Sequence, residues 1–176
     1  MAKVDIGKIL EVDLEKNSYN INKYGRENIE KFLGGPGYAI NYLMDEKTFN
    51  YDPLDNANVL ALMTGLLTGT AYPCSGFYSV SARSPQTDIY GEGLSGGFFA
   101  AELRNLFNGI VFKNKSESPK YLLIENDHFE LKDASSLWGL TTDKTIKALN
   151  SKHGKEYKIA CIGPSGEKQV PLACIM

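Results

Sequence analysis

The feature that most constrains this chain is the concentration of glycine between Thr68 and Glu102, around one alternating apolar run, Phe77–Ala82. Glycine permits positive φ angles and lets two backbones approach closely. The alternation, closed by Ser84-Pro85, predicts a strand. The glycines around it indicate either tight connections in a β-rich core or main-chain groups presented to a large ligand. The residues alone leave both interpretations open.

Size and charge exclude several classes of protein. A chain of 176 residues can form one domain with a sizeable core. Its 19 basic and 21 acidic residues give a net charge of −2, so nothing attracts it generally to nucleic acid. No apolar run approaches the ~20 residues that cross a bilayer, and residues 1–8 lack the apolar region of a secretory signal. We expect a single cytoplasmic domain over residues 1–176, without nucleic-acid or membrane partners.

The potential metal ligands are few and scattered. Cys74, Cys161 and Cys174 form no closely spaced pair, and His128 and His153 are the two histidines. Structural zinc needs four ligands, usually at short paired spacings. We therefore expect neither a zinc site nor an iron–sulfur cluster held by this chain alone. Cys161 and Cys174 lie in apolar runs and are predicted to be small buried hydrophobic residues.

Hydrophobic periodicity predicts a mixed order of strands and helices. Nine segments have strand patterns: 8–14, 18–23, 59–63, 77–82, 109–113, 120–125, 128–132, 157–162 and 169–176. Four have helical patterns: 27–33, 38–46, 95–107 and 142–152. Pro36 suits the first turn of the second helix, Ser95 is the expected N-cap of the third, and Gly154 ends the fourth. Turns are expected at Asn126-Asp127 and at 163–166. The fold class predicted is α+β, rich in β-structure.

The chain ends inside an apolar run, residues 170–176, without a polar tail. Natural termini usually fray into polar residues. Either the chain has been cut from a longer parent, or its last strand is tucked into the core.

Eight short motifs occur in one order along the chain. They are GKILEVDL (7–14), FLGG (32–35), DPL (52–54), TGLLTGT (64–70), SP (84–85), SGGFF (95–99), ASSLWG (134–139) and IGPSGE (162–167). Together they make the chain resemble the N-terminal domain of the tungsten-containing aldehyde ferredoxin oxidoreductases over essentially its whole length.

The resemblance implies a β-rich domain of two packed sheets with peripheral helices. This domain would be the base for a tungstopterin, in which two molybdopterins hold tungsten through dithiolene sulfurs and a magnesium ion bridges their phosphates. Later domains, absent here, would supply a 4Fe–4S cluster and close the aldehyde pocket. The family oxidises aldehydes to carboxylic acids and passes electrons to ferredoxin. The remaining domains and ferredoxin are thus expected partners, and a homo-oligomer is left open.

The resemblance also implies particular site residues. Gly76, Phe77, Leu94, Ser95 and Gly96 match the family's pterin-contacting positions, and the main-chain carbonyl of Leu94 matches a magnesium ligand. Gly97 completes the Ser95–Gly97 segment, where a helix N-terminus would face an anionic group. No catalytic residue is assigned to this chain.

Three positions depart from the family pattern. Phe77 stands where arginine is common, Leu94 where asparagine is usual, and Pro36 where arginine is frequent. The chain also stops before the family's Asn-Asp-Gly-His-Arg-Ala-Ala-Gly segment. An alternative reading is therefore a solitary, non-catalytic domain that acts in binding or assembly.

For four residues, a purely structural role is an alternative to contact with a ligand. We favour Phe77 as an inward residue clustered with Tyr78 or Phe98, over Phe77 stacking on a pterin. Arg83 is predicted as a surface residue at a strand end, over a phosphate clamp. Trp138 is expected to cap the core. Glu102 suits a first helical turn as well as it suits a cofactor contact. If later domains normally cover this one, the exposed side should be apolar.

Overall fold

The computed structural model describes residues 7–126 and 128–176. It divides into two compact units, one ending at Lys115 and the other running from Ser116 to Met176. Whether both units together form one domain, as the sequence predicts, stays a prediction. The units are described separately.

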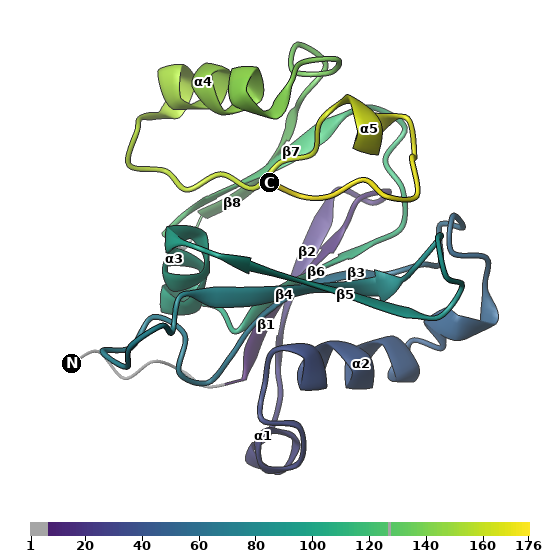
Figure 1. Cartoon of the computed structure of the whole chain (residues 1–176), viewed down its shortest axis with the longest axis vertical. Coiled ribbons are helices and arrows are strands. Elements are labelled where there is room, and N and C mark those ends of the chain that lie inside the picture. The colour runs from purple at the N-terminus through teal and green to yellow at the C-terminus, as the bar shows by residue number, and fades with distance from the viewer. Residues whose placement is uncertain (1–6, 127) are drawn as a thin grey trace. The chain divides into compact units, whose positions relative to one another are not determined.

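The first unit is built on a six-stranded sheet (Figure 1). Its strands are β1 (Lys8–Asp13), β2 (Ser18–Lys23), β3 (Leu60–Thr64), β4 (Phe77–Arg83), β5 (Tyr90–Gly96) and β6 (Gly109–Lys113). Their order is β2-β1-β6-β3-β4-β5, antiparallel except for the β1–β6 pair. The predicted opening hairpin is confirmed as β1–β2. The α+β class is also confirmed.

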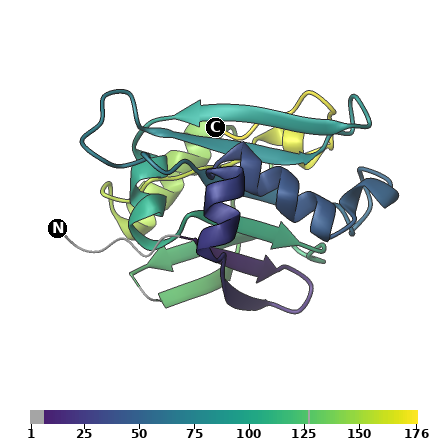
Figure 2. The ribbon, with the colours of Figure 1, turned by 90° about the horizontal axis from the view of Figure 1, so that it is seen from below.

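Helices cover both faces of this sheet. They are α1 (Arg26–Phe32), α2 (Pro36–Asp45) and α3 (Phe98–Leu106), with a 3₁₀ turn, η1, at Thr48–Asn50. Figure 1 shows α2 and α3 on opposite sides of the sheet, and Figure 2 shows α1 and α2 in front of it when it is seen from below. Pro36 lies in the first turn of α2, as predicted.

The core of this unit forms two hydrophobic layers that β3 separates. Ala61 and Met63 pack in the cluster that contains Tyr38 and Leu43 of α2. Leu62 points the opposite way and packs with Ala100 of α3 in the other cluster. Alternate strand residues face opposite sides of a sheet. Burial on both faces therefore explains why β3 is a continuous apolar run in the sequence.

The second unit contains a two-stranded antiparallel sheet and two helices. These are β7 (Lys120–Glu125), β8 (His128–Asp133), α4 (Thr142–His153) and α5 (Pro164–Glu167). Leu149 is buried on the inner side of α4, and Gly154 ends that helix with φ of 116°. Asp127, half of the turn predicted between the two strands, lies outside the described residues.

The start of the third predicted helix is wrong. Residues 90–96 form β5, a strand that the sequence analysis missed, and the helix begins at Phe98. Ser95 is paired with Tyr78 of β4, while Gly97, with φ of 118°, is the N-cap. A strand with three glycines gives no apolar alternation. Hydrogen bonds to β4 hold this strand in place. The periodicity of the sequence gives no sign of such pairing.

The strands predicted at 157–162 and 169–176 are also wrong. Both segments are irregular, although Cys161 and Met176 exchange two backbone hydrogen bonds of 2.9 Å. The turn predicted at 163–166 is the first part of α5, with Pro164 in its first turn. One hydrogen-bonded pair of residues is too few to form a β-strand pairing. The apolar composition of the two segments could not reveal that the other pairs are missing.

Two burial predictions in the second unit fail. Trp138 is 52% exposed rather than capping the core, although its turn is held by backbone bonds to Ala134. Cys174 is exposed and Cys161 is half-buried. Within residues 7–126 and 128–176, no cluster of His, Cys, Asp or Glu has the makings of a metal site. None of the helices in these ranges has the length and apolar character that a membrane span requires.

Candidate cofactor-binding site

A pocket of about 470 Å³ opens on the first unit. Three backbone segments line it, namely residues 33–36, residues 65–68 and residues 74–79 except Gly76, together with Met63 and Leu94. The first segment joins α1 to α2, the second follows β3, and the third leads into β4. Five of the lining residues are large, apolar and half-exposed or fully exposed: Leu33, Leu66, Leu67, Phe77 and Leu94.

Glycine shapes the first of these segments. Leu33, Gly34 and Gly35 have φ of 63°, 118° and 54°, a run of positive angles that reverses the chain between α1 and α2. The Gly35 amide donates to the Thr64 carbonyl at 3.0 Å, which fixes this reversal against the end of β3.

Thr68 holds the second segment. Its buried hydroxyl accepts a hydrogen bond from the Gly65 amide at 3.0 Å and donates to the Phe77 carbonyl at 2.9 Å. The Gly69 amide donates to Ser75 at 3.3 Å. A Cβ at Gly69 would lie 3.4 Å from the Ala101 backbone. The loop after β3 is thereby tied both to β4 and to α3.

Of the site residues predicted from the sequence, Phe77 and Leu94 line the pocket, and Gly76, Gly96 and Gly97 adjoin it through the β4–β5 pairing. Phe77 is paired with Gly96 across β4 and β5, and the Gly97 amide donates to the Gly76 carbonyl at 2.9 Å. A Cβ at Gly96 would lie 3.2 Å from the Phe77 ring, so the ring lies over that glycine. Leu94 is on the same face of β5 as Gly96.

The other predicted positions are placed differently. Ser95 alternates to the opposite face of β5 and does not line the pocket. Phe77 is 51% exposed, so its predicted inward orientation is wrong. Glu102, in α3, is exposed and does not line the pocket.

The sequence analysis missed several lining residues, including Leu33, Gly35, Thr68 and Cys74. All except Cys74 lie within motifs that carry the family resemblance, FLGG and TGLLTGT. Their position in these two motifs was the sequence signal that could have identified them as lining residues. Cys74 is exposed with φ of 59°, and no motif marks it.

The pocket has no charged side chain among the described residues that line it. Its polar lining side chains are uncharged, namely Thr68, Cys74, Ser75, Tyr78 and Ser79. The N-terminus of α3, which carries a partial positive charge, starts directly after Gly97, next to Gly96 of β5.

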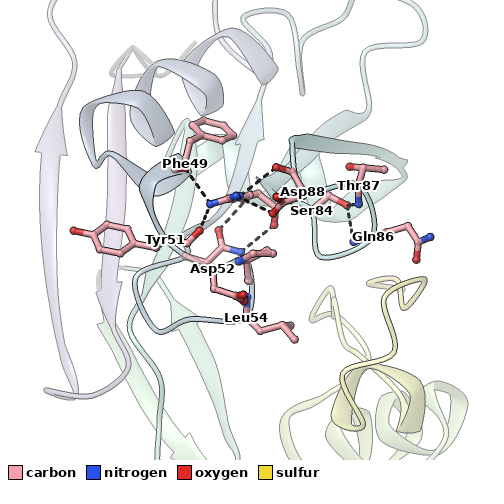
Figure 3. A network of polar contacts seen from close by, with 11 residues as sticks. Phe49, Tyr51, Asp52, Leu54, Ser84, Gln86, Thr87 and Asp88 are labelled. Carbon is pink, nitrogen blue, oxygen red and sulfur yellow. Dashed lines mark hydrogen bonds and ion pairs between the residues drawn. The ribbon is translucent and has the colours of Figure 1, made fainter.

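Arg83 is a structural tie rather than a surface residue, so its predicted exposure is wrong. Its side chain is 15% exposed. It donates to the Phe49 carbonyl at 3.0 Å, to the Tyr51 carbonyl, and to Asp88 Oδ1 at 2.8 Å. Figure 3 shows Phe49, Tyr51 and Asp88 gathered in this network. Main-chain acceptors more than 30 residues away leave no sequence signal, and with its donors engaged Arg83 is not a phosphate clamp.

The tungstopterin that the resemblance implies fits this site in part. Half-exposed Phe77 and exposed Leu94 suit the flat, apolar faces of a pterin, and the backbone at Gly97 is open, since a Cβ there would meet nothing within 4 Å. The N-terminus of α3 suits a phosphate. The described lining adds no cation, so an anionic group bound here would need charge neutralisation from groups outside the lining.

Comparisons with known proteins identify the family of this chain. The family model described as "Aldehyde ferredoxin oxidoreductase, N-terminal domain" matches residues 9–176. Proteins named "Tungsten-containing aldehyde ferredoxin oxidoreductase" are 41% identical in Thermococcus kodakarensis and 38% identical in Pyrococcus furiosus, each over 97% of this chain. The chain spans 28% of the length of either relative.

A solved structure has the same fold. The "Active site complex BamBC of Benzoyl Coenzyme A reductase in complex with 1,5 Dienoyl-CoA" matches 98% of this chain with a TM-score of 0.94 and 34% identity, and the chain covers 27% of that chain. The family match over nearly the whole sequence and this shared fold lead to one conclusion. The chain belongs to the aldehyde ferredoxin oxidoreductase family, as its N-terminal domain.

Proposed function

We propose that this chain is the cofactor-binding base of a tungsten-containing aldehyde ferredoxin oxidoreductase. The observation that carries the proposal is the open pocket lined by Phe77 and Leu94, with Gly96 beneath the Phe77 ring. Family membership supports it, because the curated relatives are named as tungsten enzymes. The group bound would be a tungsten bis-molybdopterin with magnesium.

Each part of the site has a role in this proposal. Phe77 and Leu94 contact the pterin faces and exclude water from them. The open backbone at Gly97 allows close approach, and the N-terminus of α3 orients a phosphate. The Leu94 carbonyl is the proposed magnesium ligand. The bound cofactor supplies the two-electron oxidation of an aldehyde to a carboxylic acid.

The remaining parts of the reaction lie outside this chain. Because the chain spans 28% of its relatives, we assign the 4Fe–4S cluster, the aldehyde pocket and the ferredoxin contact to the rest of a longer parent protein. The relatives differ in what their names say they act on, since one is an "Aliphatic sulfonate oxidoreductase, WOR-like subunit" from Pyrococcus furiosus. The fold by itself therefore leaves the aldehyde unspecified.

Tungsten content tests the proposal in the complete protein that contains this chain. Leu94→Glu places a negative charge in the pocket, and we expect it to lower tungsten per protein by at least half because the cofactor is anionic. Leu54→Glu is the matched control, since Leu54 is similarly exposed but does not line the pocket. Elemental analysis with far-ultraviolet circular dichroism gives the two readouts. Equal tungsten in both variants, or a fully folded complete protein without tungsten or molybdenum, would contradict the proposal.

The second outcome would favour the solitary binding domain. Phe77 and Leu94 motivate this alternative, because neither side chain offers the hydrogen bonds of the arginine and asparagine usual in the family. The length of the encoded protein distinguishes the two readings. A reading frame that continues into paired cysteines favours the enzyme.

A further inference from the structure

Phe77 lies in the pocket wall with 51% of its surface exposed. An exposed aromatic side chain at the end of a strand ordinarily has several rotamers open to it. Here two neighbours restrict it from different directions. Thr68 bonds to its main chain, and Gly96 lies against its ring. The position of this part of the wall therefore depends on both residues.

Thr68 fixes the main chain of Phe77. Its hydroxyl donates to the Phe77 carbonyl at 2.9 Å and accepts from the Gly65 amide at 3.0 Å, so one oxygen atom bridges two segments of the pocket lining. Thr68 is 5% exposed, so water does not readily replace either bond. Loss of the hydroxyl would leave the amide and the carbonyl without this partner, which favours movement of both segments.

Gly96 makes room for the Phe77 ring. The two residues are directly opposite each other in the β4–β5 pairing. A Cβ on Gly96 would have as its three nearest neighbours the Phe77 ring atoms Cε1, Cδ1 and Cζ, at 3.2, 3.5 and 3.6 Å. Gly96 is not among the glycines with positive φ, so the backbone itself does not demand glycine there. The same strand shows the contrast, because a Cβ on Gly93 would meet nothing within 4 Å.

We propose that Thr68 and Gly96 are positioning residues that hold Phe77 as a fixed aromatic wall of the pocket. This deepens the proposed function and rests on it. A flat ring packs well on an aromatic side chain only at a defined distance and angle. A wall that is fixed before binding also loses less entropy when the ligand arrives. Gly96 thus acts through the ring of Phe77, and not as a direct contact of the cofactor.

Thermal unfolding of the complete protein that contains this chain tests the contact at Gly96. Gly96→Ala is made both in the wild type and in Phe77→Ala, and the two shifts of the unfolding midpoint are compared. The added methyl group meets the ring only where Phe77 is present, so the shift should be more unfavourable in the wild type than in Phe77→Ala. Gly93→Ala, the matched control, should give the same shift in both backgrounds. Equal shifts for Gly96→Ala would overturn the proposal.

Amide hydrogen exchange tests the bridge made by Thr68. Thr68→Val removes the hydroxyl, so exchange at Gly65 and in residues 74–79 should become faster. Thr68→Ser retains a hydroxyl and should restore slow exchange. Thr64→Val is the matched control, because Thr64 is fully buried and its hydroxyl donates to the Asn108 carbonyl at 2.9 Å, yet it does not line the pocket. The bridge is refuted if exchange in residues 74–79 is unchanged in Thr68→Val, or equally fast in Thr64→Val.

Tungsten per protein, measured by elemental analysis on the same samples, gives the functional readout. Thr68→Val and Gly96→Ala should each lower it by at least half, while Thr68→Ser, Gly93→Ala and Thr64→Val should keep the wild-type content. A general loss of stability would lower it in Thr64→Val as well. Wild-type tungsten content in both Thr68→Val and Gly96→Ala would overturn this inference and leave the proposed function standing.

A wild-type parent protein that is folded but holds neither tungsten nor molybdenum would contradict the proposed function instead. The unfolding and exchange comparisons need no cofactor. They would then still decide whether Thr68 and Gly96 hold Phe77 in place.

Discussion

Among single residues, Gly109 is one of the most tightly enclosed positions in the first unit. A Cβ there would lie 2.2 Å from Met63 Sδ and 2.7 Å from the Leu62 carbonyl. The methionine side chain can move, but the backbone carbonyl cannot move without displacing β3. Glycine is therefore required because β6 and β3 approach closely, and not because of a special φ angle.

Gly109→Ala should lower the free energy of unfolding by about 1–3 kcal/mol, the usual cost of overpacking a core. Gly93→Ala is the matched control, because a Cβ at Gly93 in β5 meets nothing within 4 Å. It should leave stability unchanged or raise it by up to about 1 kcal/mol, since alanine restricts the unfolded chain. Urea denaturation measures both. Similar losses in the two variants would show that β3 and β6 are not in close contact.

Buried tyrosines should make the first unit less stable at alkaline pH. Burial raises the pKa of Tyr42 well above its usual range, and the hydrogen bond that its hydroxyl donates to Glu11 adds to the rise. The neutral phenol is thus favoured in the folded state. Its stabilisation is complete below the unfolded pKa of about 10 and is lost as pH rises beyond it.

Wild-type stability should therefore fall between pH 9.5 and pH 11. Tyr42→Phe should be less stable at pH 7, because it loses the bond to Glu11, but its stability should fall less steeply with pH. Tyr72→Phe, at an exposed tyrosine, controls for loss of a hydroxyl. Chemical denaturation at a series of pH values measures the slopes. Equal slopes for wild type and Tyr42→Phe would contradict burial of this phenol.

Among the elements, the link between η1 and the β4–β5 turn depends on Arg83. Its guanidinium bonds to carbonyls that follow α2 and to Asp88 before β5. The Arg83 amide and carbonyl add two further bonds, to the Asn58 side chain. One residue thereby joins two loops that are distant in sequence.

Arg83→Met should lower the free energy of unfolding by about 2–3 kcal/mol, because it leaves carbonyl groups and a carboxylate without their charged donor. Arg83→Lys should recover only part of this lost stability, since an ammonium group cannot reach the several acceptors that the planar, forked guanidinium bonds at once. Lys147→Met, in an exposed pair with Asp143, should cost less than about 1 kcal/mol. Denaturant titration compares them. A loss for Arg83→Met no larger than the control would contradict a structural role.

For the whole molecule, the exposed apolar surface bears on association. Leu33, Leu67, Phe77 and Leu94 are all more than half exposed and line one pocket. Such clusters in isolated domains mark surfaces that a ligand or a partner covers. This agrees with the sequence-based expectation of an apolar side.

The isolated 176-residue chain should self-associate at high concentration, and Leu67→Glu should reduce the association by charging the pocket rim. Leu172→Glu is the control, because Leu172 is exposed in the second unit and does not line the pocket. Multi-angle light scattering over a concentration series gives the mass. A monomeric wild-type chain, or an equal effect of both variants, would contradict the role of this surface.

The sequence was sufficient to predict those elements whose structure depends on residues close together in the chain. Strict alternation gave the β1–β2 hairpin, a continuous apolar run gave β3, and helical spacing with a terminal Gly154 gave α4. The motifs gave the family, because their order along the chain is itself information. These features depend on neighbours in sequence, so periodicity reports them.

Only the tertiary structure decided β5, the pocket and the contacts of Arg83. β5 exists because β4 supplies its hydrogen bonds, and Arg83 is held by carbonyls of Phe49 and Tyr51 and by Asp88. The sequence specifies which residues are glycine, apolar or charged. Which of them meet across long separations is set by packing and pairing, and no local pattern records that.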